Sequence, residues 1–101
     1  MIVVRDIFQM KFGQAKGAVD LWKQAIAVNK KLGYGNVESR ILTDLVGGPY
    51  YTLVLETTFQ SMAEFEKAMQ DVLASAEWRA IYDKIVPMVV SGRREIMRVA
   101  G

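Results

Sequence analysis

The chain has 101 residues, of which 51% are hydrophobic and 24% are charged, enough for one domain with its own apolar core. It contains no cysteine and no histidine, which excludes disulfides, thiol nucleophiles and His-dependent triads. The usual protein ligands of zinc, haem and iron–sulfur clusters are missing as well. Thirteen basic against eleven acidic side chains leave a net charge of +2, too little to attract nucleic acid or an anionic membrane. We therefore expect a single domain over residues 1–101 without metal or cofactor, nucleic-acid partner or membrane partner.

The N-terminal segment has no targeting pattern. Residues 1–12 carry charged side chains inside their apolar stretch, so they lack the apolar core of a signal peptide. No apolar run approaches the roughly 18 residues of a membrane span. The expected location is the cytoplasm.

The first third of the chain predicts a strand and a helix. Residues 2–11 alternate with a period of two, which indicates a strand with one mostly apolar face. Residues 15–32 carry apolar side chains at steps of three and four, with Asn29 on the same stripe. This spacing is typical of a half-buried helix, and Gly33 or Gly35 can end it.

The middle of the chain predicts a hairpin. Residues 36–46 alternate, and residues 50–59 are rich in aromatic and β-branched side chains on both parities. The sequence Gly-Gly-Pro at 47–49 lies between them and reverses the chain.

Two helical segments and a last strand complete the chain. Ser61 and Glu64 have the spacing of a capping box, so a helix begins there. The sequence Ala-Ser-Ala at 74–76 indicates a break before a second helical segment, and Pro87 ends it. Residues 89–99 read as a strand, interrupted or bulged near Gly92.

The order β-α-β-β-α-β predicts an α+β, ferredoxin-like sandwich: a four-stranded antiparallel sheet with helices on one face. Right-handed crossovers place the first and third strands in the centre of this sheet. The uncovered face keeps apolar side chains, which favours a homodimer with two sheets face to face over a monomer with a moderately apolar face. The residues expected on that face are Val3, Ile7, Leu53 or Val54, and Ile96 or Met97.

Three stretches carry a family resemblance: 11–13 (Lys-Phe-Gly), 51–57 (Tyr-Thr-Leu-Val-Leu-Glu-Thr), and 76–80 (Ala-Glu-Trp-Arg-Ala) running on to Pro87. With the element order, they resemble the NIPSNAP-like group of the dimeric α/β-barrel superfamily, which also includes antibiotic-biosynthesis-type monooxygenases. The resemblance implies a homodimer with a pocket. Members of the wider superfamily that degrade haem or handle dyes usually have a pocket histidine, which this chain lacks. The chain also carries Arg-Asp at 5–6, where NIPSNAP-like members commonly have Arg-Glu.

One carboxylate is a candidate catalytic group. Asp6 interrupts the apolar parity of a central strand, where a half-buried carboxylate can act as a general base. The alternative is a structural ion pair with Arg5, Arg94 or Arg98 from the same or a neighbouring strand.

Further side chains are candidates for a ligand pocket. They are large aromatic residues together with one arginine of the first strand: Trp78, Tyr50, Tyr51, Tyr82 and Arg5. Trp22 belongs to the same aromatic set, and the alternative for all of these aromatic residues is a plain core. Arg93, Arg94 and Arg98 either hold an acidic ligand or protect an exposed edge strand.

These observations favour a homodimer of uncharacterised, NIPSNAP-like type that binds a compact apolar or aromatic molecule between sheet and helices. One alternative is a cofactor-independent enzyme of the monooxygenase type. The other is a structural or regulatory homodimer without a ligand.

Overall fold

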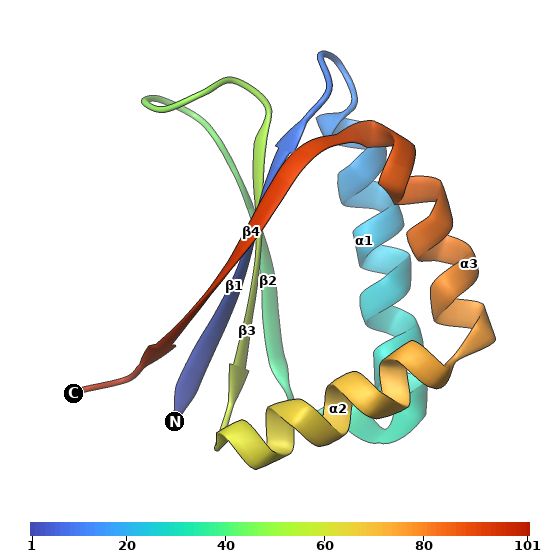
Figure 1. The fold of residues 1–101 in the computed structure, drawn as a ribbon, viewed down its shortest axis with the longest axis vertical. Coiled ribbons are helices and arrows are strands. Elements are labelled where there is room, and N and C mark those ends of the chain that lie inside the picture. The colour runs from blue at the N-terminus through green and yellow to red at the C-terminus, as the bar shows by residue number, and fades with distance from the viewer.

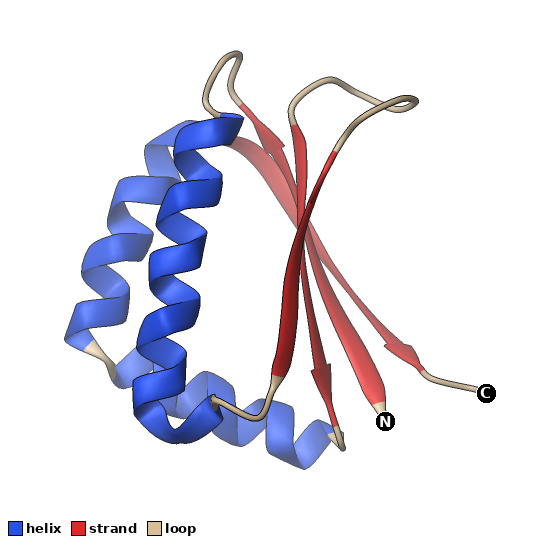
Figure 2. Cartoon of the chain, turned by 180° about the vertical axis from the view of Figure 1, so that it is seen from behind, coloured by secondary structure: helices blue, strands red, loops and turns tan.

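The computed structural model describes residues 1–101 as one sheet with three helices on a single side (Figures 1 and 2). The strands are β1 (Ile2–Met10), β2 (Glu38–Thr43), β3 (Thr52–Phe59) and β4 (Val89–Arg98). The helices are α1 (Ala15–Asn29), α2 (Met62–Ala74) and α3 (Ala76–Ile85). No helix combines the length and the apolar character that crossing a bilayer requires.

The sheet has the order β2-β3-β1-β4, and every neighbouring pair is antiparallel. The first and third strands of the chain therefore lie in the centre, as the crossover rule predicts. The predicted α+β, ferredoxin-like arrangement is confirmed. The strands at the two edges are β2 and β4.

The predicted helix at 15–32 is shorter than expected. α1 ends at Asn29 and continues as one wider turn over Lys30–Tyr34. Gly33 has a φ of 101° inside this turn, a backbone angle that glycine adopts without steric strain. The turn brings Tyr34 toward α2, where its hydroxyl donates a hydrogen bond to Asp71.

The break between α2 and α3 is confirmed and has a local cause. The Ser61 hydroxyl accepts the Glu64 N–H at 3.2 Å, so α2 begins where the capping pattern predicted. The Ser75 hydroxyl accepts the Trp78 N–H at 3.2 Å and begins α3 in a new direction. As a result, α3 runs beside α1 whereas α2 crosses one end of the molecule (Figures 1 and 2).

The irregularity in the last strand lies at Val90, two residues before the predicted position. Gln9 pairs with Ser91 whereas Met10 pairs with Val89, so Val90 is the extra residue. Gly92 itself pairs regularly with Phe8. A Cβ at residue 92 would come within 3.1 Å of the Phe8 ring, so glycine leaves room for that ring.

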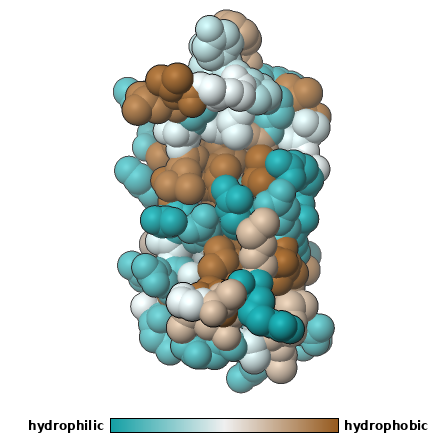
Figure 3. Space-filling model, turned by 90° about the vertical axis from the view of Figure 1, so that its left-hand side faces the viewer, coloured by the Kyte–Doolittle hydropathy of each residue, from teal (hydrophilic) through white to brown (hydrophobic).

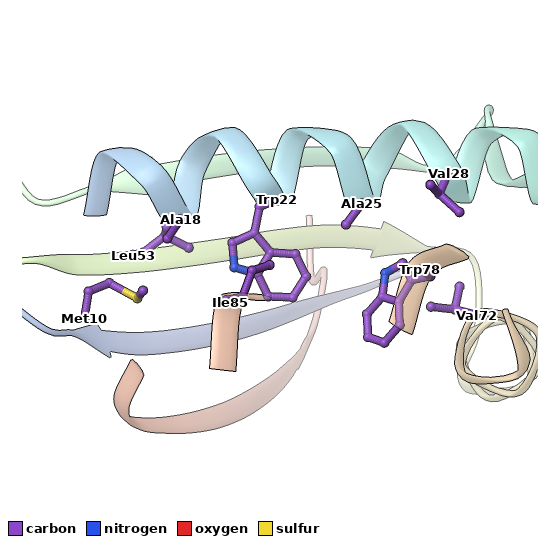
Figure 4. Packing of buried hydrophobic residues seen from close by; sticks show 9 residues of the cluster. All are labelled: Met10, Ala18, Trp22, Ala25, Val28, Leu53, Val72, Trp78 and Ile85. Atoms are coloured by element: carbon purple, nitrogen blue, oxygen red, sulfur yellow. The ribbon is translucent and has the colours of Figure 1, made fainter. Parts of the chain in front are cut away.

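The buried core is divided into two clusters. The first lies between α1, α3 and the sheet (Figure 4) and consists of Met10, Ala18, Trp22, Ala25, Val28, Leu53, Val72, Trp78 and Ile85. The second lies at the end of the molecule that α2 covers and consists of Val4, Phe59, Phe65 and Ala68. Leu53 is completely buried, so of the two residues left open by the sequence it is Val54 that lies on the outer face.

The outer face of the sheet has a row of alternating charges across all four strands. Register places Arg40, Glu56, Arg5 and Glu95 side by side on β2, β3, β1 and β4. Ion pairs join each neighbour to the next at 2.7–3.4 Å between nitrogen and oxygen. Figure 3 shows this hydrophilic band with apolar surface above and below it.

The apolar surface beside the band follows from the same register. Ile7 pairs with Val54 on one side of the charged row, and Val3 pairs with Met97 on the other. Of the alternatives left open for β4, Met97 is therefore the residue on the outer face. Ile96 pairs with Val4 and has the opposite parity.

Candidate ligand cavity

A cavity of about 430 Å³ lies between the inner face of the sheet and the three helices. Members of both core clusters line it, Trp22, Trp78 and Val72 from the first and Val4, Phe59, Phe65 and Ala68 from the second. The cavity therefore lies between the two clusters. Fifteen of its 23 lining residues are hydrophobic, so the walls suit an apolar molecule.

One wall is a connected group of aromatic rings. Trp78 and Tyr82 on α3 stack with ring centroids 5.0 Å apart, and Trp22 on α1 contacts both at 6.5 and 6.3 Å. Phe8 on β1 stacks against Trp22 at 5.6 Å. Tyr82 is the fourth residue after Trp78, so both side chains lie on the same face of α3.

An ion pair lies on the sheet side of the cavity. Asp6 and Arg94 are opposite each other in the register of β1 and β4, and Arg94 Nε donates to Asp6 Oδ1 at 2.6 Å. The Asp6 side chain is 18% exposed and that of Arg94 is 43% exposed, which places the arginine at the rim. The Arg94 guanidinium also lies 5.3 Å from the centre of the Phe65 ring, at cation–π distance.

Polar atoms without partners lie among the lining residues. Asn29 Oδ1 and Trp22 Nε1 are buried, and neither has a hydrogen-bond partner in the chain. On the sheet side, the Ser39 hydroxyl on β2 donates a hydrogen bond of 3.5 Å to the Thr57 hydroxyl on β3. A buried polar atom without a partner costs free energy, so Asn29 and Trp22 favour a molecule that supplies one.

Tyr34 joins the wide turn after α1 to α2 at the edge of the cavity. Its hydroxyl donates to the Asp71 carboxylate, and this hydrogen bond raises the pKa of Tyr34 above its ordinary value. Desolvation and the negative charges of Asp71 and Glu64 raise the same pKa further.

No group of three or more acidic side chains gathers as a metal site.

The sequence-predicted site residues divide into two groups. Asp6, Trp78 and Tyr82 line the cavity, and the ion pair of Asp6 is formed with Arg94, one of the three arginines considered. Whether these residues bind a ligand stays a prediction.

Tyr50, Tyr51 and Arg5 do not line this cavity; Tyr50 and Tyr51 line a separate hollow beside Phe12 and α1. Tyr51 packs against Phe12 with ring centroids 4.6 Å apart, and Tyr50 is 76% exposed in the loop before β3. Arg5 follows the opposite parity from Asp6 and lies in the charged row on the outer face.

The residues that sequence reasoning did not single out for the site include Asn29, Tyr34 and Phe65. Asn29 gave a signal, since it is a polar residue on the apolar stripe of its helix. Tyr34 and Phe65 gave none, because their positions depend on the wide turn and on how α2 crosses the end of the molecule.

Comparison with known proteins assigns the chain to a family. A family model described as NIPSNAP matches residues 6–101. The chain belongs to the NIPSNAP family. The resemblance seen in the sequence is thereby confirmed. No curated protein matches the sequence.

Several solved structures share the fold of this NIPSNAP protein. An uncharacterized NIPSNAP domain protein from Burkholderia xenovorans is 14% identical, with a TM-score of 0.85 over 100% of this chain and 96% of its own. A NIPSNAP family protein of unknown function from Agrobacterium tumefaciens is 19% identical, with a TM-score of 0.84 over 99% of this chain and 88% of its own.

The fold also extends to a second group. A candidate antibiotic biosynthesis monooxygenase from Nitrosomonas europaea is 12% identical, with a TM-score of 0.68 over 100% of both chains. At these identities the likenesses establish the fold alone.

Proposed function

We propose that this NIPSNAP protein binds a small apolar or aromatic molecule in the cavity between sheet and helices. The observation that carries the proposal is the cavity of about 430 Å³ between two core clusters. Protein interiors are close-packed and leave few voids larger than a water molecule. Ligand sites, by contrast, occupy roughly 300–1,000 Å³ and have mostly apolar walls with a few polar groups.

A neutral aromatic probe tests this function. Phenylnaphthylamine becomes fluorescent in apolar surroundings, and Trp22 and Trp78 report its arrival by energy transfer. Saturable binding at one site per chain is the expected result. The absence of binding would favour the remaining alternative, a structural or regulatory homodimer without a ligand.

A pair of variants on α2 locates the probe. Ala68 is buried and lines the cavity, so Ala68→Leu fills part of the space and is expected to weaken probe binding about tenfold. Ala63→Leu makes the same change at an exposed position of α2 and is the matched control. Equal affinities in the two variants would show that the probe binds elsewhere.

We also propose that a second copy of the chain covers the outer face of the sheet. Exposed and half-exposed apolar residues there, among them Val54 and Met97, favour burial against another surface. The charged row supports self-association as well. A two-fold axis parallel to the strands, running between β3 and β1, would place Arg40 opposite the partner's Glu95 and Glu56 opposite the partner's Arg5. An axis across the strands would bring like charges together.

Light scattering after size exclusion measures the oligomeric state. The wild type is expected to be a dimer at micromolar concentration, and Val54→Lys a folded monomer because it adds a charge to the apolar part of this face. Leu45→Lys adds the same charge at a position that is 95% exposed in the loop before β3 and is expected to stay dimeric. A monomeric wild type would refute the proposal.

One observation favours a second candidate function, cofactor-independent oxygenation. Asp6 places a carboxylate on the wall of an apolar cavity, where it can take a proton from a bound substrate that itself reacts with dioxygen. Oxygen consumption with hydroxyaromatic compounds measures this activity. Loss of the consumption in Asp6→Asn, with probe binding retained, is the result that would support it.

A further inference from the structure

We propose that the cavity selects an organic anion: a molecule with an apolar or aromatic body and one negatively charged group that pairs with Arg94. This inference rests on the proposed function, because it specifies which molecules enter the same cavity.

The charges around the cavity favour an anion. The charged lining residues are Asp6, Lys30, Arg93 and Arg94, one negative against three positive. Arg93 forms an ion pair with Glu95 on the outer face, which neutralises its positive charge. Asp6 then remains against Lys30 and Arg94, so an anion entering the cavity meets a net positive wall.

Arg94 has more hydrogen-bond donors than its contact with Asp6 uses. Within the chain the Arg94 side chain hydrogen-bonds only to Asp6, through Nε, and its guanidinium has two further nitrogens at the rim of the cavity. A guanidinium presents its donors in a planar fork that matches the two oxygens of a carboxylate or a sulfonate. The free side of the Arg94 fork is therefore suited to one anionic group.

The guanidinium is also held in place before any ligand arrives. Asp6 fixes one edge at 2.6 Å, and the Phe65 ring lies against it at 5.3 Å. This support lowers the entropy cost of ordering a long side chain on binding. Asp6 is thus a positioning residue for Arg94, and it also competes with the ligand for the same positive charge.

Arg98 provides the contrast within the same strand. It has the same parity on β4 as Arg94, but it does not line the cavity and has no ion pair. A role confined to protecting the strand edge would make these two arginines equivalent. A role in ligand binding makes them differ.

Two probes that differ by one sulfonate group test the inference. Anilinonaphthalene sulfonate has the same ring systems as phenylnaphthylamine with a sulfonate added. The wild type is expected to bind the sulfonate about tenfold more tightly than the neutral probe. Arg94→Gln is expected to remove that preference and to leave the neutral probe within about twofold, whereas Arg98→Gln changes neither affinity.

Variants of Asp6 separate ligand binding from structural support. Asp6→Asn removes the competing carboxylate, so the ratio of the sulfonate affinity to the neutral-probe affinity is expected to rise a few-fold. The double variant Asp6→Asn with Arg94→Gln leaves no unpaired charge and is expected to lose the preference as Arg94→Gln does. Circular dichroism and thermal unfolding establish that each variant is folded.

The outcomes are distinguishable. Equal binding of both probes to the wild type, or equal effects of Arg94→Gln and Arg98→Gln, would overturn the anion preference and leave the cavity function standing. Binding of neither probe would overturn both.

Discussion

Glu56 lies between Arg5 and Arg40 at the centre of the outer face, with its Oε2 3.2 Å from Arg5 Nε and its Oε1 2.7 Å from Arg40 Nη2. Its side chain is only 15% exposed, so both ion pairs are partly shielded from solvent. One carboxylate therefore connects three strands of the sheet.

Removing that charge should destabilise the chain. Glu56→Gln keeps the shape of the side chain but loses both charge-assisted contacts, and we expect a cost of about 1–3 kcal/mol in the free energy of unfolding. Urea denaturation measures it. Glu38→Gln, on the same face without an ion pair, is the control, and equal losses in the two variants would contradict the prediction.

Leu53 and Leu55 should respond differently to truncation although both lie on the inner face of β3. Leu53 is fully buried in the first core cluster, so Leu53→Ala is expected to cost about 2–5 kcal/mol. Leu55 lines the cavity, where fewer atoms surround it, so Leu55→Ala should cost less. Parallel urea titrations compare the two variants, and an equal or larger loss at Leu55 would refute this account of the packing.

The helix cap at Ser75 should matter for both stability and binding. Ser75→Ala removes the acceptor of the Trp78 N–H, and we expect a loss of about 1 kcal/mol in the free energy of unfolding. Because α3 carries Trp78 and Tyr82 into the cavity wall, the affinity for the neutral probe should fall as well. Ser91→Ala, at an exposed position of β4 that makes no side-chain hydrogen bond, should change neither quantity.

The raised pKa of Tyr34 predicts how stability responds to alkaline pH. The folded state keeps the Tyr34 proton above the ordinary pKa of 10.0, at which the unfolded chain releases it. The Tyr34–Asp71 contribution is therefore fully present below pH 10 and is lost as the pH rises through the folded-state pKa.

Urea titrations from pH 8 to about pH 11 measure this effect by comparison between variants. Wild type should lose more stability over this range than Tyr34→Phe, which lacks the ionisable hydroxyl. Tyr50→Phe removes a hydroxyl from a tyrosine that is 76% exposed and should behave as the wild type. Parallel curves for wild type and Tyr34→Phe would show that the hydrogen bond does not contribute.

The order of elements was predictable because its causes are local. Periodicity of two or of three and four, the capping box at Ser61, the break at 74–76 and the crossover rule together lead to the observed sheet. The sequence does not decide which of residues 53 and 54, or which of residues 96 and 97, lies on the outer face, because both members of each pair are apolar. Only their pairing with β1 decides between them.

The candidate site was less predictable because it depends on how layers pack. The extra residue at Val90 sets the parity of β4, and with it places Arg94 inward opposite Asp6. Tyr51 has a φ of 60° at the end of the loop before β3, where alternation no longer indicates a face. The cavity results from the position of α2 across the end of the molecule, which no local pattern records.

The division of the core into two clusters has a consequence for folding cooperativity. Phe65 and Ala68 of α2 pack with Val4 and Phe59 in a cluster separate from the main one, so we expect the N-terminal part of α2 to open more readily than the rest of the molecule. A bound molecule would touch both clusters and join them into one cooperative unit. Hydrogen exchange of the α2 amides would then slow on binding far more than exchange in α1, because the ligand would supply the packing between the two clusters.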